Sequence, residues 1–136
     1  MDNSTVLVVD DSAPWRRQIC SMLKRLRDVQ VIAEATDGLE AIAVVQKLQP
    51  DLILLDVDLP RLHGIETARW ILNGFPQSKI LFISQHTSAD VVQEALGTGA
   101  HGFLHKMEFG ENLGIAVKAV MRGEKFVSRR FQDPIP

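Results

Sequence analysis

Polar residues that could take part in catalysis follow most of the apolar runs in this sequence. Two adjacent carboxylates end the first run, and a third carboxylate, a hydroxyl and an ammonium group end later runs: Asp10, Asp11, Asp56, Ser84 and Lys106. Three carboxylates that lie close together repel one another unless a cation is bound between them. Oxygen donors without a neighbouring cysteine or paired histidine suit a hard cation such as Mg²⁺. The pattern therefore predicts a magnesium site with a hydroxyl and an ammonium group beside it.

A magnesium site of this composition suits phosphoryl transfer. The metal ion, Lys106 and the Ser84 hydroxyl would surround the Asp56 carboxylate with groups that bind the anionic oxygens of a phosphoryl group. Phosphoryl transfer requires mainly in-line positioning and charge neutralisation from a protein. A carboxylate nucleophile that forms an acyl phosphate is an established covalent intermediate. We therefore interpret Asp56 as a nucleophile toward phosphorus.

The elements that must position these residues alternate along the chain. Apolar, largely β-branched runs predict five strands, at Thr5–Val9, Gln30–Ala35, Leu52–Leu55, Lys79–Ile83 and Gly102–His105. Segments with helical apolar spacing lie between them, such as the segment that contains Trp15, Ile19 and Leu23. The alternation predicts an α/β fold, a doubly wound five-stranded parallel sheet with helices on both faces. Ligand sites in such sheets lie at the carboxyl ends of the strands, so the polar residues should converge there.

Turn and cap residues support this division of the chain. Pro60 and Gly64 lie in the loop after Asp56, where we expect Pro60 to restrict the backbone and Gly64 to take a positive φ. Asp37 followed by Glu40 predicts a capping box at a helix start. Asp10 and its neighbour Asp11 have an alternative interpretation, since they could cap the first helix.

The composition bounds the classes of protein to consider. A chain of 136 residues predicts one compact domain, and 46% apolar with 24% charged residues is typical of a folded chain. The net charge of −2 lacks the basic footprint of a nucleic-acid-binding protein. Cys20 is the only cysteine, which excludes an internal disulfide and favours a cytoplasmic location. No apolar run approaches the roughly 20 residues that span a bilayer.

Several motifs carry a resemblance to a known family. The segments VVDDS (8–12), LLDVDLPRLHGIE (54–66), FIS (82–84) and GTGAHGFLHK (97–106) occur in order and at matching spacings. In these segments the chain resembles the receiver domain of two-component response regulators. The resemblance covers roughly residues 1–123 and implies a flavodoxin-like strand order 2-1-3-4-5. Residues 124–136 are interpreted as the start of a linker or a tail.

The resemblance implies roles for the acidic residues. Asp56 matches the phosphoacceptor of the family. Asp11 and Asp56 match the carboxylate ligands of Mg²⁺, and Asp10 matches a supporting position. Asp58 matches the position whose backbone carbonyl binds the metal ion.

The resemblance also implies a switch. Lys106 matches the lysine that pairs with the phosphoryl oxygens or with the acceptor carboxylate. Ser84 matches the hydroxyl that moves toward the phosphoryl group, and Phe103 matches the aromatic residue that turns inward behind it. The surface expected to change is formed by the last two helices and the strand between them.

The resemblance further implies a donor and an output. The donor would be a phosphohistidine on a sensor histidine kinase or a phosphotransfer protein. The segment AVKAVMRGEKFVS resembles the end of receivers in NarL/LuxR-type transcriptional regulators. We therefore expect a DNA-binding effector that this chain lacks, no nucleic-acid contact by the chain itself, and a homodimer on phosphorylation. The chain is interpreted as an excised receiver whose only catalysis is its own phosphorylation and dephosphorylation.

Some positions differ from the common family pattern, and other functions stay open. His63 and Gln85 replace small residues near the acceptor, while Asp58 and His86 occupy variable positions over it. Our hypothesis is that Asp58 disfavours an attacking hydroxide and Gln85 narrows its approach, which would prolong the life of the phosphorylated form. The alternatives are a stand-alone receiver and a degenerate receiver that only binds partners. A more distant alternative is a haloacid-dehalogenase-type phosphatase, suggested by the DVDLP segment that begins at Asp56.

Overall fold

The computed structural model describes residues 3–86 and 88–128. Within these ranges strands and helices alternate along the whole chain. The elements are β1 (Ser4–Val9), α1 (Ala13–Lys24), β2 (Val29–Ala35), α2 (Gly38–Leu48), β3 (Leu52–Leu55), α3 (Gly64–Gly74), β4 (Lys79–Ser84), α4 (Ala89–Leu96), β5 (Gly102–His105), the 3₁₀ turn η1 (Lys106–Glu108), α5 (Phe109–Met121) and β6 (Phe126–Val127).

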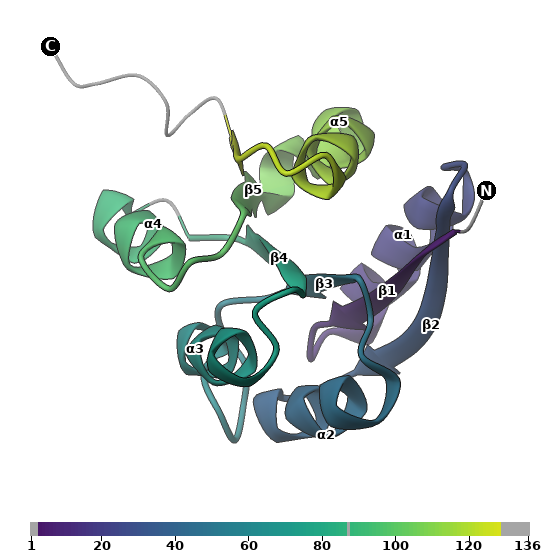
Figure 1. The fold of residues 1–136 in the computed structure, drawn as a ribbon. Coiled ribbons are helices and arrows are strands. Elements are labelled where there is room, and N and C mark those ends of the chain that lie inside the picture. The colour runs from purple at the N-terminus through teal and green to yellow at the C-terminus, as the bar shows by residue number, and fades with distance from the viewer. Residues whose placement is uncertain (1–2, 87, 129–136) are drawn as a thin grey trace, which may run out of the picture.

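The strands form a single parallel sheet with helices on both faces. Its order is β2-β1-β3-β4-β5-β6. Figure 1 shows α1 and α5 on one face of this sheet and α2, α3 and α4 on the other. Every residue of β3 and β5 is buried, as expected of strands that are covered on both faces. The predicted doubly wound α/β fold is therefore confirmed.

Alternate residues of each strand serve two separate apolar cores. In β3, Ile53 packs toward α2, α3 and α4, whereas Leu52 and Leu54 pack toward α1 and α5. Helix α1 contributes Ile19 and Leu23 to its own core, which is the face that the apolar spacing predicted. The period of two along the strands and of 3.6 along the helices thus explains the layered arrangement.

The sheet of the described residues contains one short strand in addition to the five that the sequence predicted. Residues 126–127, within the predicted linker, form β6 parallel to β5. Phe126 N–H donates to the His101 carbonyl at 3.1 Å, and Ser128 N–H donates to the Phe103 carbonyl at 2.9 Å. Gly102 allows this approach, because a Cβ there would lie 2.8 Å from the Phe126 carbonyl oxygen. A two-residue strand carries no apolar period, and residues 129–136 of the predicted linker lie outside the described ranges.

None of the helices in the described ranges is long and apolar enough to cross a membrane.

Candidate functional site

The carboxyl ends of β1, β3 and β5 meet at one edge of the sheet, where a pocket of about 330 Å³ opens. Its lining contains most of the residues singled out in the sequence: Asp10, Asp11, Ser12, Trp15, Asp56, Asp58, Gln85 and Lys106. A water molecule takes up about 30 Å³ in the liquid, so the pocket has room for a small anionic group together with several waters. The predicted convergence of charged residues at the strand ends is therefore present.

The start of α1 leaves the first two carboxylates facing this pocket. Ser12 is the N-cap of α1, and its Oγ accepts a hydrogen bond from Trp15 N–H at 3.3 Å. Asp10 Oδ1 accepts from Ser12 N–H at 2.8 Å, while Asp11 is exposed at the pocket. The alternative interpretation, in which Asp10 and Asp11 serve as the helix cap, is therefore not needed for this helix.

The acidic residues fit a hard divalent cation. Asp10, Asp11 and Asp56 each offer a carboxylate oxygen, and these oxygens lie within 4.8 Å of one another. Asp10 Oδ2 is buried and makes no hydrogen bond to any described residue, although Lys106 Nζ lies 2.8 Å away. A buried acceptor with spare capacity and an oxygen-only donor set match the preferences of Mg²⁺.

The Asp56 carboxyl group lies in an unfavourable environment for its charge. Its side chain is 8% exposed, and loss of hydration is the main cause that raises its pKa to about 6. The nearby Asp10 carboxylate raises the pKa further, whereas Lys106 and the Asp58 backbone N–H lower it. A bound cation would relieve this cost, since positive charge favours the ionised carboxylate.

Lys106 bridges two of the carboxylates from the end of β5. Its Nζ lies 2.8 Å from Asp10 Oδ2 and donates a hydrogen bond to Asp56 Oδ2 at 3.3 Å. The same Nζ lies 4.9 Å from the centroid of the Trp15 ring. The sequence reasoning assigned Trp15 only to the apolar face of a helix. Its position one turn after Asp11, on the helix that leaves the carboxylate pair, was the signal that it could reach the site.

The two predicted switch residues lie apart from the pocket lining. Ser84 is fully buried, and its Oγ accepts a hydrogen bond from His86 N–H at 3.1 Å. Phe103 is also fully buried, with its ring 6.1 Å from that of Phe82. The structure thus places Ser84 at the end of β4, directly before the loop residue Gln85 that lines the pocket, and Phe103 in the core beside β4.

The side chains of Asp58, His63 and His86 form a more exposed cluster beside the buried part of the pocket, here called the rim. His86 Nε2 lies 2.9 Å from Asp58 Oδ1 and 2.8 Å from Asp58 Oδ2, so it contacts both oxygens. His63 Nε2 lies 3.7 Å from Asp58 Oδ1. Asp58 N–H in turn donates to Asp56 Oδ1 at 3.3 Å. The two variable positions that the sequence placed over the acceptor therefore contact each other.

A buried histidine connects this rim to the last strand. His105 Nδ1 accepts from Met107 N–H at 3.0 Å, so its Nε2 carries the proton and donates to the Gln85 carbonyl at 3.1 Å. His105 N–H donates to Ser128 Oγ at 2.7 Å. The loop after β4 is therefore linked through one residue to the residue that follows β6, since the His105 side chain contacts Gln85 and its backbone N–H contacts Ser128. Nothing in the local sequence indicated this role, because it depends on three segments that are distant along the chain.

The loop after Asp56 has a different backbone from the predicted one. Gly64 does not take a positive φ, and Arg61 does, at 68°. Gly64 is required for space instead, since a Cβ there would lie 2.0 Å from the Asp56 carbonyl oxygen. Gly64 N–H also donates to the Val57 carbonyl at 2.8 Å, which fixes the start of α3 against the acceptor loop.

Comparison with protein families gives a match over most of the chain. Residues 6–118 match the model described as the response regulator receiver domain. Among curated proteins, the transcriptional regulatory protein DegU of Brevibacillus brevis is 32% identical over 122 residues, which cover 90% of this chain and 52% of that protein. The response regulator protein VraR of Staphylococcus aureus is 34% identical, with 88% of this chain and 57% of that protein covered. The chain thus spans about half the length of these curated relatives.

Solved structures agree in fold. A two-component response regulator of the LuxR family from an Aurantimonas species has a TM-score of 0.91 at 27% identity, over 96% of this chain and 93% of that one. The signal receiver domain of the putative response regulator NarL from Mycobacterium tuberculosis has a TM-score of 0.86 at 30% identity, over 91% of this chain and 100% of that one.

Proposed function

This chain belongs to the response regulator receiver domain family, and we propose that it acts as a switch that accepts a phosphoryl group on Asp56. The observation that carries the proposal is the position of Asp56 within the buried charge cluster. Its carboxylate lies with two further carboxylates inside 4.8 Å, and Lys106 Nζ lies 3.3 Å from its Oδ2. One nucleophilic carboxylate, a cation site and an ammonium group are what phosphoryl transfer to a carboxylate requires.

The proposed step transfers a phosphoryl group from the donor to Asp56. The P–N bond of a phosphohistidine, or the P–O bond of a small acyl phosphate, breaks as an Asp56 oxygen forms a new O–P bond. The electron pair of the broken bond stays with the donor: a histidine ring nitrogen then takes a proton from water, whereas the carboxylate of an acyl phosphate leaves as the anion. Hydrolysis reverses the state when a water oxygen attacks phosphorus and the Asp56 O–P bond breaks.

Side chains of the pocket would prepare Asp56 for this step. With its pKa raised to about 6, the carboxylate is ionised near pH 7 and remains more basic than an ordinary aspartate. Lys106 would hold one oxygen of the acceptor and then meet the charge of the transferred group. Mg²⁺, held by Asp11 and Asp56 with the Asp58 backbone carbonyl and supported by Asp10, would neutralise the phosphoryl oxygens when bound.

Phosphorylation would act on the loop after β4. We propose that the phosphoryl group attracts the Ser84 hydroxyl, which now accepts from His86 N–H at 3.1 Å. Movement of this loop would reach Phe103 and change the surface of α4, β5 and α5, which shifts an existing equilibrium. Strand β6 adds a route to the carboxyl-terminal segment, because His105 contacts both Gln85 and Ser128.

The proposed partners rest on membership of the receiver family. A sensor histidine kinase or a phosphotransfer protein would supply the phosphoryl group, and the output would be control of transcription. Two of the matched curated proteins are named as a transcriptional regulatory protein and a response regulator, and this chain spans about half of each. We therefore propose a DNA-binding effector outside this chain and a homodimer of the phosphorylated form.

The proposal is tested by the mass of the intact protein. The chain is incubated with Mg²⁺ and acetyl phosphate, alongside Asp56→Asn as the matched control. We expect one added phosphoryl group on the native chain only, dependent on Mg²⁺ and removed by hydroxylamine, as an acyl phosphate would be. A folded native chain that gains no phosphoryl group, either from acetyl phosphate or from a phosphorylated kinase, would overturn the proposal.

A further inference from the structure

The Lys106 ammonium group lies between the carboxylates of Asp10 and Asp56, and it is attracted to both. Its Nζ lies 2.8 Å from Asp10 Oδ2 and 3.3 Å from Asp56 Oδ2, and its side chain is 5% exposed. Lysine has a flexible stem and a compact charge, so two carboxylates alone do not set the orientation of the ammonium. A third contact is needed if the ammonium is to stay in place when the charge on Asp56 changes.

The Trp15 ring supplies this third contact. Lys106 Nζ lies 4.9 Å from the ring centroid, within the range of a cation–π interaction. Tryptophan is the strongest aromatic partner for a cation, and the interaction strengthens where the ammonium is shielded from water. Trp15 also lines the phosphoacceptor pocket, so its ring forms part of the wall beside the reacting group.

The Trp15 ring is itself fixed from two sides. Its backbone N–H donates to the N-cap Ser12 Oγ at 3.3 Å, in the first turn of α1. Its ring meets the Phe109 ring edge to face, with centroids 5.5 Å apart and an interplanar angle of 72°. Phe109 is the first residue of α5 and is 9% exposed. The ring is therefore positioned by α1 and by α5 together.

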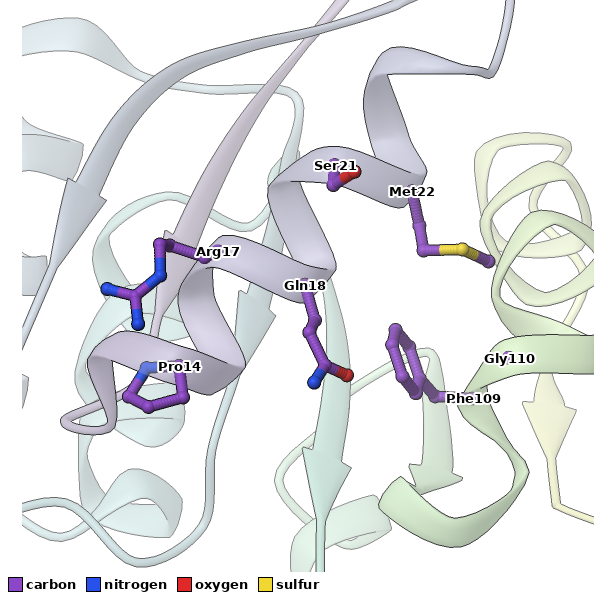
Figure 2. Close-up of a pocket in the computed structure, with 7 residues that line it drawn as sticks. All are labelled: Pro14, Arg17, Gln18, Ser21, Met22, Phe109 and Gly110. Atoms are coloured by element: carbon purple, nitrogen blue, oxygen red, sulfur yellow. The ribbon is translucent and has the colours of Figure 1, made fainter.

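Phe109, which packs against the Trp15 ring, also lines a groove between these two helices. Figure 2 shows its side chain projecting from the start of α5 toward α1, across from Gln18 and Met22. The groove therefore contacts the aromatic pair through Phe109.

We infer that Trp15 is a positioning residue, which holds the Lys106 ammonium over its ring during phosphorylation of Asp56. A ring face carries no hydrogen-bond acceptor of its own, so it holds the cation without occupying an N–H that a phosphoryl oxygen needs. The ammonium can then turn from the Asp56 oxygen to the new phosphoryl oxygens while it stays at the ring. This inference rests on the proposed phosphoacceptor function.

The first test compares rates of phosphorylation by acetyl phosphate in the presence of Mg²⁺. We expect Trp15→Phe, which keeps an aromatic face, to lose no more than about threefold, and Trp15→Leu to lose roughly fivefold to thirtyfold. Trp70→Leu is the matched control, since Trp70 is 47% exposed on α3 and should leave the rate unchanged. Equal rates for Trp15→Phe and Trp15→Leu would overturn the inference, because a role in packing alone needs no ring face.

The second test does not depend on phosphorylation. Urea unfolding of Trp15→Leu, Lys106→Met and the double variant forms a double-mutant cycle. We expect the two changes to be coupled by at least about threefold in the unfolding equilibrium constant, since each removes the same contact. Additive effects would show that Trp15 and Lys106 are not coupled, which would overturn the inference that Trp15 positions the ammonium group. If the native chain takes up no phosphate, the proposed function fails and the positioning role fails with it, while coupling in the cycle would still report the contact.

Discussion

The floor and the rim of the phosphoacceptor pocket contain similar charged contacts in opposite environments. In the floor, the side chains of Asp10, Asp56 and Lys106 are 1%, 8% and 5% exposed. In the rim, the side chains of Asp58 and His86 are 61% and 33% exposed. The closest distance between a nitrogen and a carboxylate oxygen is 2.8 Å in both regions. Distance therefore does not distinguish the two regions, and hydration does.

Because the floor and the rim differ in hydration, we expect their charged contacts to contribute differently to stability and function. A buried charge that loses its partner is costly, because nothing replaces the lost hydration. An exposed pair contributes little, since water and salt screen it and its side chains lose rotamer freedom. The floor is therefore expected to determine whether the site functions, and the rim to adjust how fast the site turns over.

Lys106→Met should give the largest effect, because it leaves two carboxylates in the floor without their cation. We expect the free energy of unfolding at pH 7 without divalent cations to fall by about 3–5 kcal/mol. Adding Asp56→Asn should restore part of this loss by removing one of the charges. Urea unfolding measures both effects, with Lys118→Met on the exposed face of α5 as the control. A loss as small as that of the control would remove the distinction between floor and rim.

The pH dependence of stability should report the charge on Asp56. Its pKa is about 6 in the folded chain against 3.8 for an ordinary aspartate, so the folded state holds the proton more tightly. The stability of the native chain relative to Asp56→Asn should therefore fall as pH rises from about 4 to about 6 and stay level above. The full difference is on the order of 3 kcal/mol in favour of the Asn variant.

Unfolding of both proteins at several pH values without divalent cations checks this expectation. Mg²⁺ should reduce the difference above pH 6, because the cation offsets the charge of the native carboxylate. A difference that does not change with pH would show that Asp56 has an ordinary pKa.

Ser128→Ala should give an intermediate effect, since it removes the buried hydrogen bond between Ser128 and His105. The His105 side chain also contacts the loop after β4 at the Gln85 carbonyl. His105 N–H would lose its acceptor Ser128 Oγ, at a cost of about 1 kcal/mol. Amide exchange should accelerate at residues 126–128 and in the loop that contains Gln85. Ser88→Ala is the control, because the Ser88 side chain makes no capping hydrogen bond in the described structure. Unchanged exchange in the loop would show that the contact through His105 does not connect the two segments.

His86→Ala should change stability by less than about 1 kcal/mol, because its partner Asp58 is mostly exposed. The change should shrink further in 1 M salt, which screens an exposed pair. Thermal or urea unfolding at low and high salt measures it. A loss of stability comparable to that of Lys106→Met would show that the exposed contact of the rim contributes as much as the buried contacts of the floor.

Gln85→Ala should act on the lifetime of the phosphorylated form and leave stability nearly unchanged. Gln85 lines the pocket, so a smaller side chain opens the approach of water to phosphorus. We expect the loss of phosphate to accelerate roughly threefold, which corresponds to less than 1 kcal/mol in the barrier. Intact mass followed over time measures the loss, with Gln93→Ala on the exposed face of α4 as the control. An unchanged lifetime would reject the hypothesis that Gln85 restricts access.

The sequence alone determined the architecture and the chemical composition of the site. Apolar runs defined β3 and β5 at their observed bounds, since buried strands need continuous apolar residues. The helix cap at Asp37 was also correctly predicted, because Glu40 N–H donates to Asp37 Oδ1 at 2.8 Å, while the Glu40 carboxylate accepts from Thr36 N–H at 2.7 Å, one residue before the N–H of the common capping box. The chain direction in a parallel sheet then placed Asp10, Asp56 and Lys106 at one edge. These features follow from local patterns and from rules of topology.

Only the tertiary structure decided how the site is supported. Strand β6 exists because Gly102 leaves room for the Phe126 carbonyl, and Gly64 is required by the Asp56 carbonyl rather than by a positive φ. The contact of Trp15 with Lys106 joins α1 to the end of β5. Each of these depends on the distance between segments that lie far apart in the chain. Local periodicity shows which face of an element is buried, but it does not show which atoms meet there.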